Sequence, residues 1–290
     1  MERWIVLALV GLAAQLVDGS LGMAYGLTST TLLLATGLSP AAASASVHLS
    51  EVGTTLASGL SHWKMGNVQW RAVKWMAIPG AVGGFLGAVA LSNLSAEAAK
   101  PWIAGFLMAL GVYILARFAG SGERPVEARP VRARMLAPLG LVAGFLDAAG
   151  GGGWGPIATP TLLASGRMAP RQVVGTVDTS EFLVALSASL GFLLALGSEP
   201  IVWPVVAALL CGGVVAAPIA ASLVRWLHPR LLGTIVGGVI LLTNLRTLLK
   251  AFGADETVTA GVYALLAVLW LGALGSAVIG LRRQSLPEGA

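Results

Sequence analysis

The sequence predicts an all-α polytopic membrane protein with two inverted-topology repeats that contain broken or half helices, plus one extra C-terminal transmembrane helix. The first observation is composition: 56% of the residues are hydrophobic and 11% are charged, whereas soluble domains carry about 25% charged residues. The second is the presence of nearly charge-free segments at 201–224, 231–245 and 257–281. These reach up to the roughly 20 residues that a helix needs to cross a bilayer, far more than a barrel strand. A porin-like barrel and a soluble enzyme are excluded.

The basic residues predict the orientation of the chain in the membrane. The 18 Lys and Arg outnumber the 13 Asp and Glu, but they lie in short connections and not in one patch, so no nucleic-acid partner is expected. Membrane proteins keep Lys and Arg in cytoplasmic loops. We therefore expect the 64–74 connection, the 119–134 linker and the segment after Arg283 to be cytoplasmic, and 198–200 to be outside. The chain is predicted to be a multi-pass protein of the cytoplasmic (inner) membrane, with the N-terminus outside and the C-terminus cytoplasmic.

The third observation is an internal duplication. Leu16-Val17-Asp18-Gly19 recurs as Phe145-Leu146-Asp147-Ala148, and the register continues from Gly22 and Gly26 to Gly151 and Gly155. After one inserted residue, Pro40 matches Pro170 and Glu51 matches Glu181. Corresponding connections fall on opposite sides, which predicts inverted repeats, the arrangement typical of secondary transporters. The predicted organisation is a first transmembrane repeat at 1–118, a cytoplasmic basic linker at 119–134, a second repeat at 135–251, and an extra helix with a cytoplasmic tail at 252–290.

Each half contains a glycine-rich interruption. A helix of about 15 residues is predicted to end at Asp18 or Asp147, and another of about 11 residues follows the break, both shorter than a full span. Glycine lets a ligand approach the backbone closely, and the helix that follows the second break starts with free N–H groups and a positive dipole end, a site for an anion. A glycine-rich helix-packing interface is the alternative. The predicted substrate-binding residues are Gly22, Gly26, Thr28, Thr30, Gly151, Gly152, Gly153, Trp154, Thr159 and Thr161.

Several ionisable residues lie in otherwise apolar segments at repeat-equivalent positions. An ionisable group at mid-bilayer costs at least about 2.5 kcal/mol, so it is a functional candidate, although neutral carboxyls that bond across helices would explain it too. Carboxylates repel a nearby anion, so Glu51 and Glu181 must be protonated while substrate is bound or exchange places with it. An imidazole titrates near neutral pH, which makes His48 the expected internal proton partner. The predicted proton-coupling residues are Asp18, His48, Glu51, Asp147, Asp178 and Glu181.

Other function classes are weighed by their motifs. No Gly-x-Ser-x-Gly elbow and no His-Glu-x-x-His are present, so an enzyme is not expected. No P-loop is present either, and we expect no cofactor and no resident metal. Oxygen and imidazole ligands suit a divalent cation, however. A divalent-cation transporter that uses His48, Glu51, Asp178 and Glu181 therefore stays open as the alternative.

The motifs of the second half carry a family resemblance. Residues 143–147 with Gly151-Gly152-Gly153 and Pro160, followed by Pro170 and Val173-Val174-Gly-Thr, resemble the duplicated motif of the TauE/SafE sulfite exporter family, also called the four-toluene-sulfonate uptake permease family. The first copy departs from it, with Leu21–Gly26 in place of a glycine triplet. The resemblance implies a proton-coupled secondary transporter, with export expected, that moves sulfite, a sulfonate or a related small sulfur-containing anion by alternating access. The expected partners are that anion and the lipid bilayer, and a homodimer is left open.

Overall fold

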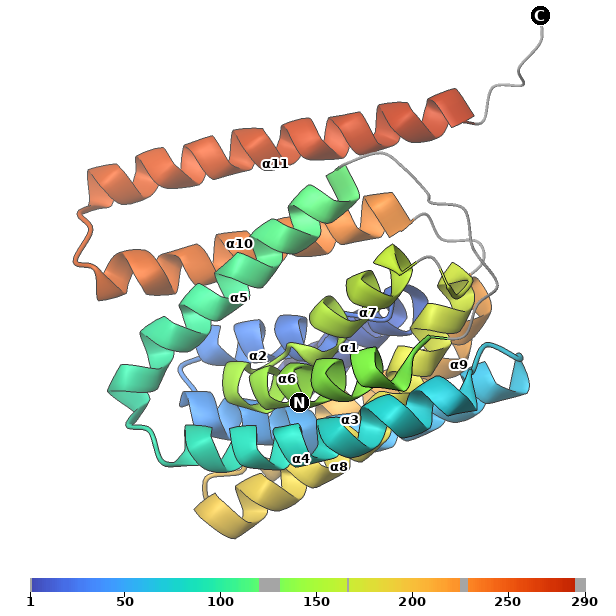
Figure 1. Cartoon of the computed structure of the whole chain (residues 1–290). Coiled ribbons are helices and arrows are strands. Elements are labelled where there is room, and N and C mark those ends of the chain that lie inside the picture. The colour runs from blue at the N-terminus through green and yellow to red at the C-terminus, as the bar shows by residue number, and fades with distance from the viewer. Residues whose placement is uncertain (1, 120–130, 166, 225–228, 285–290) are drawn as a thin grey trace, which may run out of the picture.

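The computed structural model describes residues 2–119, 131–165, 167–224 and 229–284. Over these ranges the chain forms eleven helices and no strand, and seven helices are long and apolar enough to cross a membrane (Figure 1). This confirms the all-α polytopic fold class. Most of the predicted linker, Arg225 and the end of the tail lie outside the described ranges. The helices are α1 Glu2–Leu21, α2 Tyr25–Ala35, α3 Pro40–Lys64, α4 Trp70–Ser92, α5 Ala96–Ala119, α6 Ala133–Gly150, α7 Trp154–Ala164, α8 Pro170–Leu196, α9 Trp203–Leu223, α10 Pro229–Ala251 and α11 Glu256–Gln284.

Two long helices, α3 and α8, form the centre of the bundle. Each begins with a proline at its first turn, where the missing N–H costs nothing, and Ser39 caps α3 by accepting a hydrogen bond from the N–H of Ala42 at 3.3 Å. α3 and α8 pack against each other, and α9 and α4 cover them. α3 carries its Ser, Thr, His and Glu side chains into the protein and not toward lipid. A polar helix is tolerated here because its neighbours surround it.

The packing of the outer helices follows the duplication. α1 runs along α9, with Gly11 against Leu209 and Gly19 against Ala220. α6 runs along α4 in the same way, with Gly140 against Met76 and Gly144 against Gly80. The first helix of each repeat thus packs against a helix of the other repeat. The contacts between helices are therefore the same when the two repeats are exchanged. The inversion across a membrane remains a prediction, which this pattern supports.

The first two helices of each repeat form a hairpin. Leu7 at the start of α1 and Leu33 at the end of α2 belong to one core cluster with Val205 of α9, so the hairpin returns to the end of the bundle where it began. Leu136 of α6 and Leu162 of α7 share a second cluster in the same way. The hairpins therefore enter the bundle and leave it again at one end.

The predicted lengths of these helices need correction. α1 has 20 residues and α6 has 18, because both continue for three residues beyond the aspartate that was expected to end them. The residues after each aspartate, 19–21 and 148–150, are small or apolar and remain helical. Only α2 and α7, with 11 residues each, are short. The interruptions shrink to 22–24 and 151–153.

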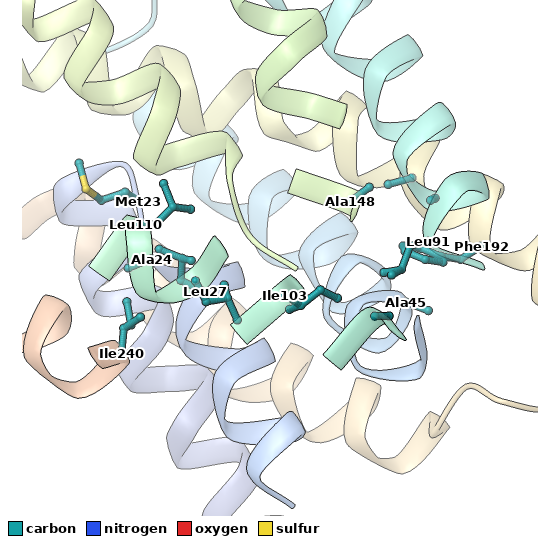
Figure 2. Close-up of a cluster of buried hydrophobic side chains, with 14 of the residues drawn as sticks. Met23, Ala24, Leu27, Ala45, Leu91, Ile103, Leu110, Ala148, Phe192 and Ile240 are labelled. Atoms are coloured by element: carbon teal, nitrogen blue, oxygen red, sulfur yellow. The ribbon is translucent and has the colours of Figure 1, made fainter. Parts of the chain in front are cut away.

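The last helices cover one side of the bundle. α5 packs on α10, and α11 lies along α10 at the surface (Figure 1). In Figure 2, Met23 and Leu27, at the first interruption, share a buried cluster with Ile103 and Leu110 of α5 and with Ile240 of α10. α5 and α10 therefore close over the interruptions from the side. α11 buries little of its surface, as expected for an extra helix outside the repeats.

We expect Gly144→Ala to destabilise the fold. The added Cβ would overlap the carbonyl oxygen of Gly80, so α6 and α4 would have to separate, at a cost of roughly 1–3 kcal/mol. Gly275→Ala is the control, because no atom lies within 4 Å of a Cβ at that position on α11. The melting temperature of the purified protein in detergent should fall for the first variant and hold for the second. Equal melting temperatures would show that the α4–α6 contact is not tight.

Candidate functional site

The two interruptions pack against each other at the centre of the bundle. Gly22 and Gly151, which are equivalent, have φ of 69° and 75°, in the left-handed region that glycine adopts at little cost. A Cβ on Gly152 would overlap the backbone of Leu27, and one on Gly26 would lie 3.0 Å from the Cα of Gly152. The glycines therefore serve close backbone packing.

The first interruption breaks at the same place without a glycine triplet. Ala24, the equivalent of Gly153, has φ of 103°, where an L-residue is strained. The side chain of Thr159 donates a hydrogen bond to the carbonyl oxygen of Gly22, which fixes one interruption to the short helix that follows the other. The chain breaks at the same place in both repeats, but the backbone differs in detail, because Gly153 has φ of −141° where Ala24 has 103°.

A carboxylate from the protein occupies the N-terminus of each short helix. The N–H groups of Gly153 and Trp154 donate to Oδ1 of Asp147 at 2.7 and 3.0 Å, and the N–H of Tyr25 lies 3.4 Å from Oδ1 of Asp18. In this structure the N–H groups of Gly153 and Trp154 are therefore bonded to Asp147, and their binding of a substrate stays a prediction. The indole N–H of Trp154 is also committed, because it donates to the carbonyl oxygen of Val177 at 3.0 Å.

Three buried residues form what we call the first triad: His48, Glu51 and Asp147. Nε2 of His48 lies 3.2 Å from Oδ2 of Asp147 and 3.9 Å from Oε2 of Glu51. Nδ1 of His48 lies 2.8 Å from the carbonyl oxygen of Ser44, which can only accept, so Nδ1 carries a proton. A second proton must then lie between Nε2 and Asp147, on one side or the other. His48 and Asp147 therefore share a proton.

The second triad consists of Asp18, Asp178 and Glu181, which are the equivalents of Asp147, His48 and Glu51. Within each triad the ligand atoms lie within 4.8 Å of one another. Ser58 donates a hydrogen bond to Oδ2 of Asp178. Each triad takes one aspartate from α1 or α6 and two residues from the central helix of the other repeat. The structure thus brings all six predicted proton-coupling residues together, but as two symmetric groups.

His62 also belongs to the site, although the sequence analysis did not select it. It is fully buried, Nε2 donates to the carbonyl oxygen of Gly19 at 3.0 Å, and Nδ1 faces the side-chain amide of Asn67 at 3.2 Å. Nε2 lies 3.6 Å from Oδ2 of Asp178. By sequence, His62 is assigned to a cytoplasmic connection because it lies beside Lys64. The duplication could have identified it: His62 is equivalent to Phe192, and the ring of Phe192 lies 5.8 Å from that of His48.

The charges of the two triads do not balance. In the described part of the chain, only histidines form ion pairs with the five carboxyls. Both oxygens of Glu51, Oδ2 of Asp18 and Oδ1 of Asp178 are buried without a hydrogen-bond partner. Several uncompensated negative charges this deep would cost many kcal/mol. The site is therefore built to hold protons or cations.

The predicted threonines lie at different places. Thr30 is buried against Gly151, and its hydroxyl has no partner, while Thr159 is committed to Gly22. Thr28 is half-buried on α2. Thr161 is half-buried, and its hydroxyl donates to the carbonyl oxygen of Ile157 at 2.6 Å. Only Thr30 and Thr159 lie at the junction of the interruptions.

The seven helices of the described ranges that are long and apolar enough to cross a membrane agree with the comparisons with known proteins, which identify the chain as a membrane transporter. A profile described as "Sulfite exporter TauE/SafE" matches residues 7–247, and the chain belongs to that family. It is 52% identical over 276 residues to the "Probable membrane transporter protein YtnM" of Bacillus subtilis (strain 168), covering 94% of this chain and 92% of the relative. No solved structure gave a significant match.

We expect opposite effects from neutralising the two equivalent aspartates. Asp147→Asn removes a charge that accepts two N–H groups and faces His48, and a charged hydrogen bond contributes about 1.5–3 kcal/mol, so stability should fall. Asp18→Asn removes one of three crowded carboxyls with a single long hydrogen bond, so stability should hold or rise. Thermal unfolding of both variants at pH 7 measures the difference. Equal losses would contradict the assigned roles.

Proposed function

We propose that the protein is a secondary transporter, and in direction an exporter, of sulfite, a sulfonate or a related small sulfur-containing anion, coupled to protons. The observation that carries this proposal is the pair of buried triads beside two opposed short helices. Helix N-termini bind anions without Lys or Arg, and the triads hold protons. Membership of the sulfite exporter family supports the substrate class.

In this proposal the substrate competes with a carboxylate of the protein. The side chain of Asp147 acts as an internal anion at the N-terminus of α7 while no substrate is bound. Transfer of a proton from His48 neutralises Asp147 and weakens its hold on the N–H groups of Gly153 and Trp154. A substrate anion can then replace it. His48, left neutral, takes up a proton from water, so that one proton is bound with each anion, which provides coupling without ATP.

Alternating access follows from the exchange of helices between repeats. Each short helix contacts the interruption of the other repeat, so movement of one hairpin alters the environment of both triads. Glu51 lies beside Gly26 and Glu181 occupies the equivalent position, so each would lose or gain its proton as water reaches it from one side. The predicted division of the chain into repeats at 1–118 and 135–251 is part of this proposal.

Labelling tests the proposed orientation in the cytoplasmic membrane. On a Cys211→Ser background, single cysteines at residues 65 and 199 should react from opposite sides, with residue 65 cytoplasmic. The reason is that Lys64, Arg71 and Lys74 flank the first position, whereas the second lies in a connection without positive charge. Labelling from the same side would refute the inverted topology.

Proton coupling is tested by Glu51→Gln and Glu181→Gln in liposomes. Glutamine keeps the shape of the neutral acid but cannot release a proton. At least one variant should still bind sulfite, should lose most of the flux that a pH gradient drives, and should retain part of the anion exchange. Wild-type dependence on the pH gradient in both variants would show that the carboxyls are structural.

A divalent-cation transporter is the second candidate, because each triad groups three ligand-type residues. The bond from Nδ1 of His48 to a backbone carbonyl leaves Nε2 facing the triad, as in many metal sites. The same liposomes, assayed with sulfite, sulfoacetate, sulfate and divalent cations, separate the candidates. Cation flux without anion flux, lost in both glutamine variants, would favour the second.

A further inference from the structure

A second polar region lies away from the triads, at the end of the bundle where the linker enters α6. A cavity of about 640 Å³ opens there between α5, α6 and α7. Its volume falls within the range of about 300–1,000 Å³ typical of small-molecule sites. The lining residues are Tyr113, Arg132, Arg134, Met135, Pro160, Thr161, Ser165 and Arg167.

Three arginines and no acidic residue are found among the residues that line the cavity. Arg132 and Arg134 are exposed, and neither forms an ion pair with a carboxylate in the described ranges. Arg132 is also the N-cap of α6, which has no side-chain cap and no acidic residue in its first turn. The unpaired N–H groups and the positive dipole end of α6 therefore lie beside two arginines.

Helix α7 contributes residues both to the cavity and to the junction of the interruptions. Thr161 lies two residues from Thr159, whose side chain bonds to Gly22 at the junction of the interruptions. The hydroxyls of Thr161 and Ser165 donate to carbonyls of their own helix, so the arginines and the end of α6 supply the donors. An anion in the cavity would lie at the C-terminal end of α7, where the helix dipole is negative, so the arginines must outweigh it.

The repeats differ at this position. Arg134 and Met135 correspond to Ile5 and Val6 of the first repeat, which are exposed and apolar. Arg132 corresponds to Arg3, so the second repeat differs by the additional arginine at position 134. Placement of positive charge in the cytoplasm explains arginines in this connection, but not a cavity around them.

We propose that this cavity is an entry site that collects the oxoanion or sulfonate substrate on the linker side. The inference rests on the proposed function. A cleft lined by one sign of charge raises the local concentration and the association rate of a counter-ion tenfold or more. An anionic lipid headgroup has the same charge chemistry and is the competing occupant.

The test uses full-length protein in liposomes with a defined fraction in each orientation. The double variant Arg132→Gln/Arg134→Gln should raise the KM for sulfite presented on the linker side about tenfold, with kcat within about twofold of wild type. The KM from the opposite side should be unchanged. Arg171→Gln is the matched control, because Arg171 is an exposed arginine at the start of α8 that does not line the cavity. An unchanged KM on the linker side overturns the proposal.

Lipid composition separates the two occupants. The same KM shift should be seen in phosphatidylcholine liposomes and in liposomes that contain phosphatidylglycerol. A shift confined to phosphatidylglycerol would assign the cavity to a lipid headgroup and overturn the entry site.

A binding measurement keeps the inference testable if the proposed function fails. Sodium sulfite, compared with sodium chloride at equal ionic strength, should raise the melting temperature of the wild type and of Arg171→Gln by more than that of the double variant, which keeps only the central site. Sulfite flux through the wild type with equal shifts in all three proteins would leave the proposed function standing without the entry site. A larger shift in the wild type than in the double variant, without sulfite flux, would leave the anion site standing without the proposed function. Neither flux nor a shift would reject both.

Discussion

A buried carboxylate that must be compensated without any fixed cation organises the centre of this protein. Asp147 lies at the N-terminus of a short helix, accepts two backbone N–H groups and faces an imidazole. The helix end exists only because the chain interrupts itself at 151–153 and turns back on itself. The hairpin, the interruption and the aspartate thus depend on one another. The buried N–H groups at the helix end need a hydrogen-bond acceptor, and the buried carboxylate needs donors.

Both repeats contain this arrangement, but the residues at equivalent positions differ. Asp18 repeats the role of Asp147 with a single weaker bond, and Asp178 stands where the first triad has His48. His62 lies at the position where the second repeat has Phe192. The first triad therefore contains an imidazole, that of His48, and the second triad has the imidazole of His62 beside it. The two repeats thus place similar helices around unequal sets of ionisable groups.

Close backbone contact is what allows the two copies to share a centre. Gly80 and Gly144 bring α4 and α6 together, and Gly26 and Gly152 bring the two interruptions together. Helices in lipid gain little from apolar association, so packing of small residues takes its place. The abundance of glycine therefore reflects the need for helices to approach closely. The cavity lined by arginines lies elsewhere, at the C-terminal end of α7.

Composition, charge placement and the duplication were enough to predict the all-α membrane fold and the position of both interruptions, and to select the six ionisable residues that the structure groups in two triads. These features are local or periodic, so a linear sequence displays them. The sequence could not show that Asp18 joins Asp178 or that Asp147 joins His48, because each triad crosses between repeats and depends on how α1 and α6 pack. Nor could it show that N–H groups open to an anion in an isolated half-helix are already bonded to Asp147. Hydrogen-bond donors along a chain can be counted from sequence, but which acceptor reaches them is decided by tertiary packing alone.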